Sequence, residues 1–296
     1  MQMSDSLVSI GLPVYNGGQR LEEVVWSVLA QDHPRIELVI SDNASTDDTE
    51  EVCRELARAD SRIVYHRQAR NVGLLNNFVH AIQVARGTFF RWIGDDDWMA
   101  PDYVSRCLES FAEDERRVLV TTRLAYTAPD GATLPVPDYD GARMTSPDPL
   151  VRFTEILRLL NAPLFQVDPL YGMVRRVPVA AIRRRNMLRE DEVFACKLAL
   201  LGPWGHVPEI LAHRNTRNTG NLSDIARFLN VPVWQAHFTN VLQCREILQW
   251  LPEADLTESQ RRAARAAVAR MFLRRQHRMA VHRGRKVVRM AAALVK

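Results

Sequence analysis

The first hundred residues alternate short apolar runs with helical patterns, and this rhythm constrains the fold more than any other feature. The runs are rich in β-branched residues and do not alternate cleanly, which is typical of strands buried on both faces. They lie at Leu7–Val14, Ile36–Ser41, Arg62–His66 and Thr88–Gly94, with helical patterns between them at Leu21–Gln31, Thr49–Ala59 and Leu74–Arg86. Strand, helix and strand at this spacing imply parallel strands joined by right-handed crossovers. The sequence therefore predicts an α/β fold with a doubly wound, mostly parallel sheet flanked by helices.

The rest of the chain is less regular. A helix is predicted after Pro101, residues 128–149 are rich in Pro, Gly and Asp and predict a long surface loop, and the chain is predicted to be helical from about Ser223 onward. Further strands are predicted at Arg117–Thr122 and Leu170–Val174, and further helices at Leu150–Leu160 and Glu192–Leu201.

The composition predicts a soluble protein of the reducing cytosol. Apolar residues make up 47% of the 296 residues, no apolar run reaches the length of a membrane span, and no signal peptide is visible at the N-terminus. The four cysteines are far apart and form no CxxC pair, which argues against a zinc site or a disulfide framework.

A polar cluster follows each of the first four predicted strands. The clusters are Pro13–Gly18, Asp42–Asp48, Arg70–Gly73 and Gly94–Trp98. Because ligands bind beyond the carboxyl ends of parallel strands, we expect these clusters to share one functional edge of the sheet. The chain has neither GxGxxG nor GxxxxGK[ST], which argues against a dinucleotide enzyme and a P-loop kinase.

Three aspartates stand side by side in the last of these clusters, at Asp95, Asp96 and Asp97. Adjacent carboxylates repel one another unless a cation or solvent relieves them, and Mg²⁺ and Mn²⁺ prefer oxygen ligands. The triplet therefore predicts a divalent metal; the alternative is a solvated loop in which an aspartate caps the next helix. Asp42 is predicted to accept hydrogen bonds from a ribose or a base, with a simple helix-entry role as its alternative.

The segments Pro13–Asn16, Ser41–Asp47, Arg70–Gly73 and Asp95–Trp98, in this order, resemble the motifs of glycosyltransferase family 2. The resemblance covers residues 6–222. It implies a GT-A fold, a nucleotide diphosphate-sugar donor with a UDP-sugar favoured, Mn²⁺ or Mg²⁺, and direct displacement with inversion at the anomeric carbon. It implies a catalytic domain over residues 1–222, with a nucleotide-binding half (1–100) and an acceptor half (101–222). The resemblance does not explain the last quarter of the chain, whose helical pattern predicts a helical extension over residues 223–296.

The resemblance also implies roles for single residues. Those expected to bind the nucleotide-sugar are Pro13, Tyr15, Asn16, Asp42, Asn71, Gly73, Asp95 and Arg214. The family's metal motif often reads Asp-x-Asp-Asp, and its first position is Gly94 here; this leaves Asp96 as the best metal ligand, with Asp97 beside it. His213 is a further candidate metal ligand, in a segment, Ala212–Thr219, that matches the family only in part because Thr216 stands where a histidine is expected.

An inverting transfer needs a base on the acceptor side, and the resemblance implies an acidic pair at a helix start for this purpose. Asp191 is the predicted base and Glu190 its neighbour. Acidic residues also favour a helix N-terminus without any catalytic role.

Two other functions stay open. A sugar nucleotidyltransferase shares the α/β architecture but is expected to carry a basic, glycine-rich loop after the first strand, which Asn16–Gln19 does not supply. A non-catalytic binding protein would keep the fold without needing both the aspartate triplet and the acidic pair.

The C-terminal tail is strongly basic. Residues 261–296 hold twelve Lys or Arg and no Asp or Glu, whereas residues 1–260 hold 27 basic and 35 acidic residues. The apolar residues Ala264, Val268, Met271, Phe272 and Met279 fall near one face of a predicted helix. This pattern predicts an interfacial helix that holds the protein at the inner face of the plasma membrane; the alternative is a helix packed on the catalytic domain. Few aromatic residues interleave the arginines, which disfavours nucleic acid as the partner.

Overall fold

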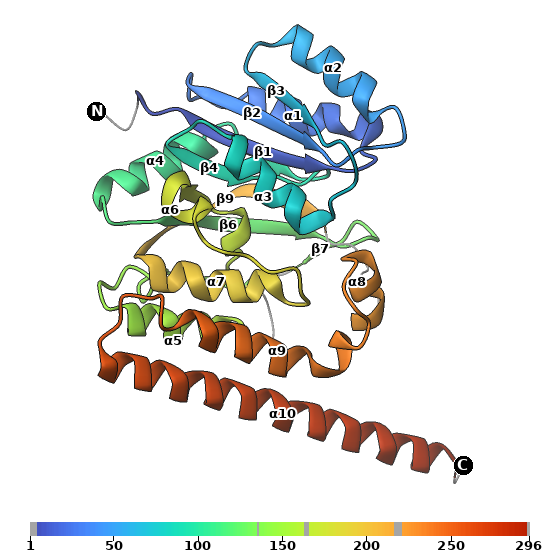
Figure 1. Ribbon diagram of the computed structural model, residues 1–296, viewed down its shortest axis with the longest axis vertical. Helices are drawn as coiled ribbons and strands as arrows, with labels where there is room; N and C mark the ends of the chain where they lie inside the picture. The colour runs from blue at the N-terminus through green and yellow to red at the C-terminus, as the bar shows by residue number, and fades with distance from the viewer. Residues whose placement is uncertain (1–4, 135, 163–165, 216–220, 295–296) are drawn as a thin grey trace.

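The computed structural model describes residues 5–134, 136–162, 166–215 and 221–294, with side chains of the last helix described to Arg278. A single sheet runs through the described part of the chain in the order β3-β2-β1-β4-β8-β6-β9-β5, with β7 paired to β6. Helices cover both faces of this sheet, and the C-terminal helices form further layers on one side (Figure 1).

The first four strands are parallel, as predicted. They are β1 (Val8–Val14), β2 (Ile36–Asp42), β3 (Ile63–Arg67) and β4 (Phe89–Trp92), joined by α1 (Leu21–Leu29) with the short 3₁₀ turn η2 (Gly18–Arg20), α2 (Thr49–Ala59) and α3 (Leu74–Val84). Every residue of β1 and β2 is buried, which explains why their apolar runs do not alternate. The predicted α/β fold is confirmed here.

The second half of the sheet is mixed. Strand β8 (Met173–Arg175) is antiparallel to β4 and to β6 (Leu119–Thr127), and the two-residue strands β5 (Trp98–Met99) and β7 (Thr133–Leu134) add further antiparallel pairs. The long strand β9 (Trp204–Asn215) runs parallel to β6, with register shifts near Arg123. The sequence did not predict β9, because Pro208 and Glu209 interrupt its apolar pattern and three consecutive residues there are exposed.

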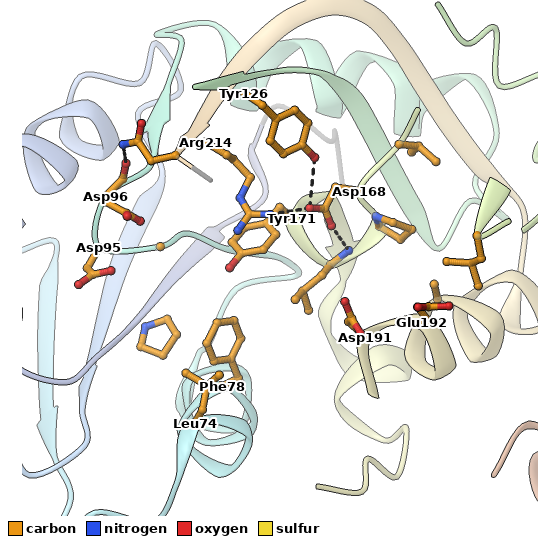
Figure 2. A pocket seen from close by; sticks show the side chains of 18 of the residues that line it. Leu74, Phe78, Asp95, Asp96, Tyr126, Asp168, Tyr171, Asp191, Glu192 and Arg214 are labelled. Carbon is orange, nitrogen blue, oxygen red and sulfur yellow. Dashed lines mark hydrogen bonds and ion pairs between the residues drawn. The ribbon is translucent and has the colours of Figure 1, made fainter. Parts of the chain in front are cut away.

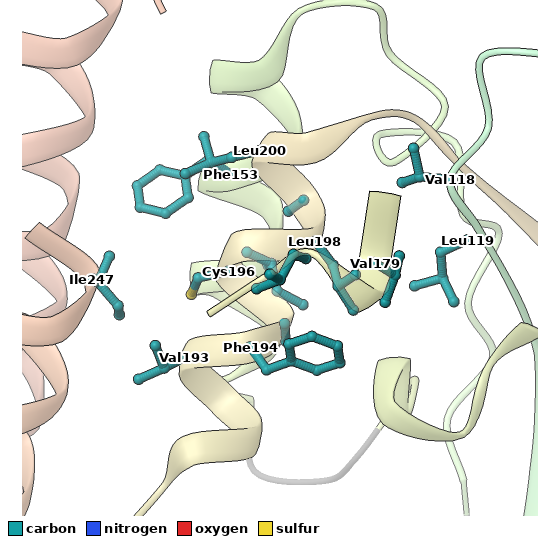
Figure 3. Packing of buried hydrophobic residues seen from close by; sticks show 14 of the residues in the cluster. Val118, Leu119, Phe153, Val179, Val193, Phe194, Cys196, Leu198, Leu200 and Ile247 are labelled. Atoms are coloured by element: carbon teal, nitrogen blue, oxygen red, sulfur yellow. The ribbon is translucent and has the colours of Figure 1, made fainter. Parts of the chain in front are cut away.

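The helices of the second half are α4 (Tyr103–Glu113), α5 (Pro149–Leu159), η3 (Pro169–Tyr171), α6 (Arg176–Ala180) and α7 (Glu190–Leu201). Helix α7 lies at their centre. All residues from Val193 to Leu200 are buried. They pack toward Ile247 on one side and toward Val118 and Leu119 on the other (Figure 3). A helix buried all round has little freedom to shift, so its N-terminus is held at a fixed place beside the sheet edge.

The extension consists of α8 (Leu222–Phe228), α9 (Gln235–Trp250) and α10 (Glu258–Leu294). Helix α10 packs on α5 and α9, and Ala264, Val268 and Met271 are buried in the core that also contains α7. The prediction that this stripe faces a membrane is therefore wrong, because the chain itself removes the stripe from water. The side chain of Met279 lies outside the described residues. No described helix is long and apolar enough to span a bilayer.

Candidate functional site

A cavity of about 480 Å³ opens at the carboxyl ends of β1 and β4 and reaches the N-terminus of α7 (Figure 2). It brings together five of the predicted site residues: Pro13, Asp95, Asp96, Asp191 and Arg214. The others do not line it: Tyr15, Asn16, Asp42, Asn71, Gly73, Asp97, Glu190 and His213. The cavity therefore joins the acidic triplet's loop to the acidic pair at the helix start, across about a hundred residues of sequence.

Three acidic residues open α7, and two of them are held by arginines. The guanidinium of Arg184 donates to both carboxylate oxygens of Glu190, with 2.7 Å from Nε to Oε1. Arg184 itself lies over the ring of Phe194, with 4.1 Å from its guanidinium carbon to the ring centre. Glu190 is thus tied into the wall beside the cavity, which suits a structural neighbour of the base.

Glu192 is also engaged. Its Oε1 accepts from Arg189 at 2.9 Å, and its Oε2 accepts from Gln243 at 2.9 Å and from Arg275 at 2.6 Å. Arg189, which precedes the helix, adopts a left-handed conformation with φ of 61°, an uncommon state for a residue with a side chain. The chain thus turns sharply into α7 with its first-turn acids fixed on either side of Asp191.

Asp191 differs from its neighbours, because no ion pair to it occurs among the described residues, and its side chain is exposed to the cavity. The protein surrounding the cavity nevertheless limits hydration of the carboxylate, and this desolvation raises the pKa of Asp191 to about 6. The negative charges of Glu192, Glu190 and Asp168 act in the same direction, whereas a backbone hydrogen bond from Glu192 opposes them. A carboxylate with this pKa is ionised at neutral pH and is suited to accept a proton.

Asp95 and Asp96 present oxygen ligands to the same cavity from the loop after β4. Asp95 pairs with Arg20 at 3.4 Å, and the backbone carbonyl of Asp96 accepts from Asn215 at 2.6 Å. No group of three or more His, Cys, Asp or Glu suited to a metal ion occurs in the described part of the chain. Mg²⁺ is typically held by one or two carboxylates together with substrate phosphates, so these two aspartates fit a hard cation that arrives with a phosphorylated ligand.

The other two predicted metal ligands lie elsewhere. Asp97 is buried; its Oδ2 accepts from the backbone N–H of Gly94 at 3.0 Å and pairs with Arg214 at 3.3 Å, and burial raises its pKa. His213 is neighbour to Arg214 on β9 and therefore points to the opposite face, where its ring packs against Trp98. Asp97 thus braces the loop and His213 lies outside the cavity, whereas Asp95 and Asp96 line it.

Arg214 lines the cavity and joins two loops. Beyond its pair with Asp97, its Nη1 donates to Asp168 at 2.6 Å, and its guanidinium lies over the ring of Tyr171 at 3.5 Å. Asp168 also accepts from the hydroxyl of Tyr126 at 3.4 Å. Asp168, Tyr171 and Tyr126 were not predicted as site residues, because an aspartate before a proline signals only a cap, and Asp168 does cap η3 through the N–H of Leu170. Thr216 lies outside the described residues.

Asp42 is engaged within the protein, and its predicted contact with a ribose or a base stays a prediction. Its side chain is fully buried. One carboxylate oxygen accepts from the N–H and hydroxyl of Ser45 at 2.9 Å and 2.6 Å, and the other accepts from Tyr65 at 2.7 Å and Arg67 at 3.2 Å. Both carboxylate oxygens therefore accept hydrogen bonds within the protein, and those from Ser45 fix the loop after β2.

The remaining predicted nucleotide contacts lie on loops at the same sheet edge. Asn16, with φ of 55°, accepts from the N–H of Thr46 at 2.9 Å and so joins the loops after β1 and β2. The Oδ1 of Asn71 accepts from Asn43 at 3.0 Å and from the N–H of Gly73 at 2.9 Å, which fixes the entry into α3. Tyr15 is exposed. These side chains support a loop surface next to the cavity.

A second pocket, of about 410 Å³, adjoins the first and shares Asp191, Tyr171 and Phe78 with it. Its outer wall is apolar and is supplied by Leu222, Ile225 and Leu229 from the region of α8. Asp191 thus lies where two compartments meet, one bordered by the aspartate loop and the other by α8.

Replacing Arg275 by methionine is expected to destabilise the protein by about 3 kcal/mol. Arg275 is buried, and its loss removes one of the two ion pairs of Glu192 and the donors to the side-chain oxygens of Asn161 and Gln243, although Arg189 and Gln243 still donate to Glu192. Thermal or chemical unfolding measures the change in the free energy of unfolding. The exposed Arg274→Met is the matched control and is expected to shift it by less than about 0.5 kcal/mol; equal effects of both changes would contradict a role for the buried pair.

Comparison with known proteins gives one family. The family described as Glycosyl transferase family 2 matches residues 9–190. Glycosyltransferase GlyA of Streptococcus pneumoniae is 28% identical over 134 residues, which is 43% of this chain and 18% of that protein. The chain spans less than two thirds of the length of the curated relatives that it matches.

Two solved structures share the fold. The S. aureus TarS fragment 1–349, in complex with UDP-GlcNAc, has a TM-score of 0.65 at 18% identity and covers 90% of this chain and 72% of that one. The mannosyltransferase PcManGT of Pyrobaculum calidifontis, in complex with GDP-Man and Mn²⁺, has a TM-score of 0.54 at 16% identity and covers 90% of this chain and 87% of that one.

Proposed function

The chain belongs to glycosyltransferase family 2, and on this premise we propose that it transfers a sugar from a nucleotide diphosphate-sugar to an acceptor hydroxyl by direct displacement with inversion. The observation that carries the proposal is the placement of Asp191, which faces the same cavity as Asp95 and Asp96. A nucleotide-sugar needs a place for its phosphates and a base for the incoming hydroxyl, and one cavity offers both.

In this mechanism, Asp191 takes the proton of the acceptor hydroxyl while that oxygen attacks the anomeric carbon from the side opposite the diphosphate. General base catalysis of this kind contributes about 10²–10⁴-fold in rate. Asp96, with Asp95 beside it, would hold Mn²⁺ or Mg²⁺, which neutralises charge on the leaving diphosphate when bound. Arg214 positions the loop of Asp95 and Asp96 by its pairs with Asp97 and Asp168.

We assign the two compartments to the two substrates. The first holds the donor's sugar and phosphates, with the base and ribose on the loops of Tyr15, Asn16, Asn71 and Gly73. The second, apolar at α8, takes the acceptor, a hydroxyl compound such as a growing glycan or glycoconjugate. Structures of the same fold hold UDP-GlcNAc in TarS and GDP-Man in PcManGT, which supports a nucleotide-sugar donor, and we propose a UDP-sugar.

A panel of UDP-, GDP- and dTDP-sugars with Mn²⁺, scored for release of free nucleotide, tests the proposal. We expect release from at least one UDP-sugar, and its loss in Asp191→Asn. Nucleotide release that is equal in wild type and Asp191→Asn for every donor would contradict the proposed chemistry, and absence of binding to any donor by calorimetry would contradict the proposed substrate class.

The pKa of about 6 at Asp191 predicts the pH dependence of catalysis. Protonation removes the base, so kcat/KM is expected to fall about tenfold for each pH unit below 6 and to level off above about 7. Initial rates between pH 5 and 9 at subsaturating substrate measure this profile. A flat profile between pH 5 and 7 would show that another group accepts the proton.

We further propose that the protein acts in the cytoplasm at the inner face of the plasma membrane. The basic composition of residues 261–296 supports this placement, although the stripe that was predicted to make the contact is buried.

A further inference from the structure

Helix α9 carries an apolar stripe that faces solvent. Trp234 is the N-cap of α9, Phe238 lies at a kink in the helix, and Val241 and Leu248 follow three and ten residues later; each is between 39% and 55% exposed. The rings of Trp234 and Phe238 lie 6.3 Å apart. Large apolar side chains scattered singly need no explanation, but four along one helix face form a surface that is suited to a partner.

A groove of about 510 Å³ lies beside this stripe, between α9 and α10. Val241 and Leu248 line it from α9, and Val268 and Phe272 line it from α10. Arg245 and Arg265 also line the groove, one from each helix. We call the stripe together with these two arginines the α9 face.

The charge around the α9 face has one sign. The sequence contains no Asp or Glu from residue 225 to 245 and none after Glu258. Glu246, the one acid within α9, pairs with Arg185 and Lys197 and lines a different pocket with them. A partner that covers the stripe therefore meets Arg245 and Arg265, while the carboxylate of Glu246 is paired elsewhere.

We propose that the α9 face binds the surface of an anionic lipid bilayer. Tryptophan and phenylalanine side chains insert at the boundary of headgroups and acyl chains, while arginines pair with anionic headgroups. The basic residues of the last 36 positions, apart from the buried Arg275, add charge of the same sign. A second copy of this chain is a poorer occupant, because a symmetric contact would bring arginines against arginines.

The α9 face lies close to the cavity along the chain, which suits an acceptor that is carried by a lipid. Phe228, at the end of α8, is exposed and also lines the cavity, and the chain runs from it through a short turn into Trp234. An acceptor carried by a lipid would therefore reach the cavity from the same surface that holds the protein. The lipid contact itself does not depend on the proposed sugar transfer.

Co-sedimentation of the full chain with vesicles tests the proposal. We expect binding to phosphatidylcholine vesicles that contain phosphatidylglycerol, weaker binding as salt rises, and little binding to phosphatidylcholine alone. The double variant W234S/F238S is expected to lower the vesicle-bound fraction at least about fivefold, and R245Q/R265Q is expected to weaken binding to anionic vesicles.

Trp26→Ser is the matched control, because Trp26 is more exposed than Trp234 but lies on α1, far from α9 (Figure 1). It is expected to bind vesicles as the wild type does. Light scattering after gel filtration, without lipid, measures whether the protein forms a dimer. A wild-type dimer that becomes monomeric in W234S/F238S would show that the α9 face binds a second copy of the chain and would overturn the lipid proposal. Failure of the wild type to bind anionic vesicles, or equal loss in W26S and W234S/F238S, would overturn the proposal, whereas nucleotide release from a donor tests the transfer separately.

Discussion

Replacement of Asp191 by asparagine is expected to lower turnover by about two orders of magnitude or more while donor affinity is retained. Asparagine keeps the shape of the side chain but does not accept a proton at neutral pH. Glu190 and Glu192 are held by arginines on either side, so neither is free to take over the base without breaking an ion pair. Steady-state turnover and calorimetric titration of the donor, measured on the same preparation, separate chemistry from binding.

Stability provides a check that the loss is catalytic. Because the folded protein raises the pKa of Asp191 to about 6, its ionised form is less favourable in the fold than in the unfolded chain. The wild type therefore loses stability from this group as pH rises through 6, and Asp191→Asn does not. We expect the melting temperature of Asp191→Asn minus that of the wild type to increase between pH 5 and pH 8. A rate within a few-fold of wild type in this stable variant would require another base, with Glu190 the first to test.

The first half of the fold could be predicted closely, for a physical reason. Parallel strands covered by helices on both faces are continuous apolar runs, so β1 and β2 were visible and their parallel direction followed from the crossovers. Strand β9 contains buried residues at both ends of an exposed stretch. The proline and the glutamate in this exposed stretch interrupt the apolar pattern from which a strand is predicted. Because β9 was not predicted, the alternation of side chains along it was not available, and the sequence did not show that His213 and Arg214 point to opposite faces.

The candidate site could be predicted as a place but only partly as a set of contacts. Polar residues after adjacent parallel strands do gather at one edge, and Asp96 and Asp191 meet at one cavity. Sequence position does not distinguish a carboxylate that faces a ligand from one whose oxygens are taken up inside the protein, as for Asp42 and Asp97. Asp168 was missed for the related reason that its only local signal is that of a cap.

An amphipathic pattern likewise tells which face of a helix is apolar and not what covers it. The weak stripe of α10, built on Ala264, Val268 and Met271, packs on α5 and α9. The stronger exposed stripe lies on α9, where Trp234 and Phe238 face solvent. Arg275, which interrupts the tail's apolar face, is buried and reaches Glu192 at the start of α7. The extension is thus part of the support of the candidate base.

Asp96→Ala is expected to remove the metal-dependent part of donor binding while leaving the fold intact. Asp96 lines the cavity with its carboxylate and contributes no apolar packing, so truncation costs little stability. In the wild type, Mn²⁺ is expected to tighten the binding of a UDP-sugar, because the cation screens the diphosphate from the aspartates. In Asp96→Ala, calorimetric titrations with and without Mn²⁺ are expected to give the same affinity.

Asp97→Asn distinguishes this role from a general disturbance of the loop. Asp97 braces Gly94 and pairs with Arg214, so its substitution is expected to lower the melting temperature, whereas Asp96→Ala is not. If the cation is held at Asp96, the titration of Asp97→Asn still shows tighter donor binding with Mn²⁺ than without it. A metal effect that survives in Asp96→Ala and disappears in Asp97→Asn would move the ligand to the buried aspartate. The two substituted residues are neighbours in the chain but lie in different environments, because Asp96 faces the cavity and Asp97 faces the interior.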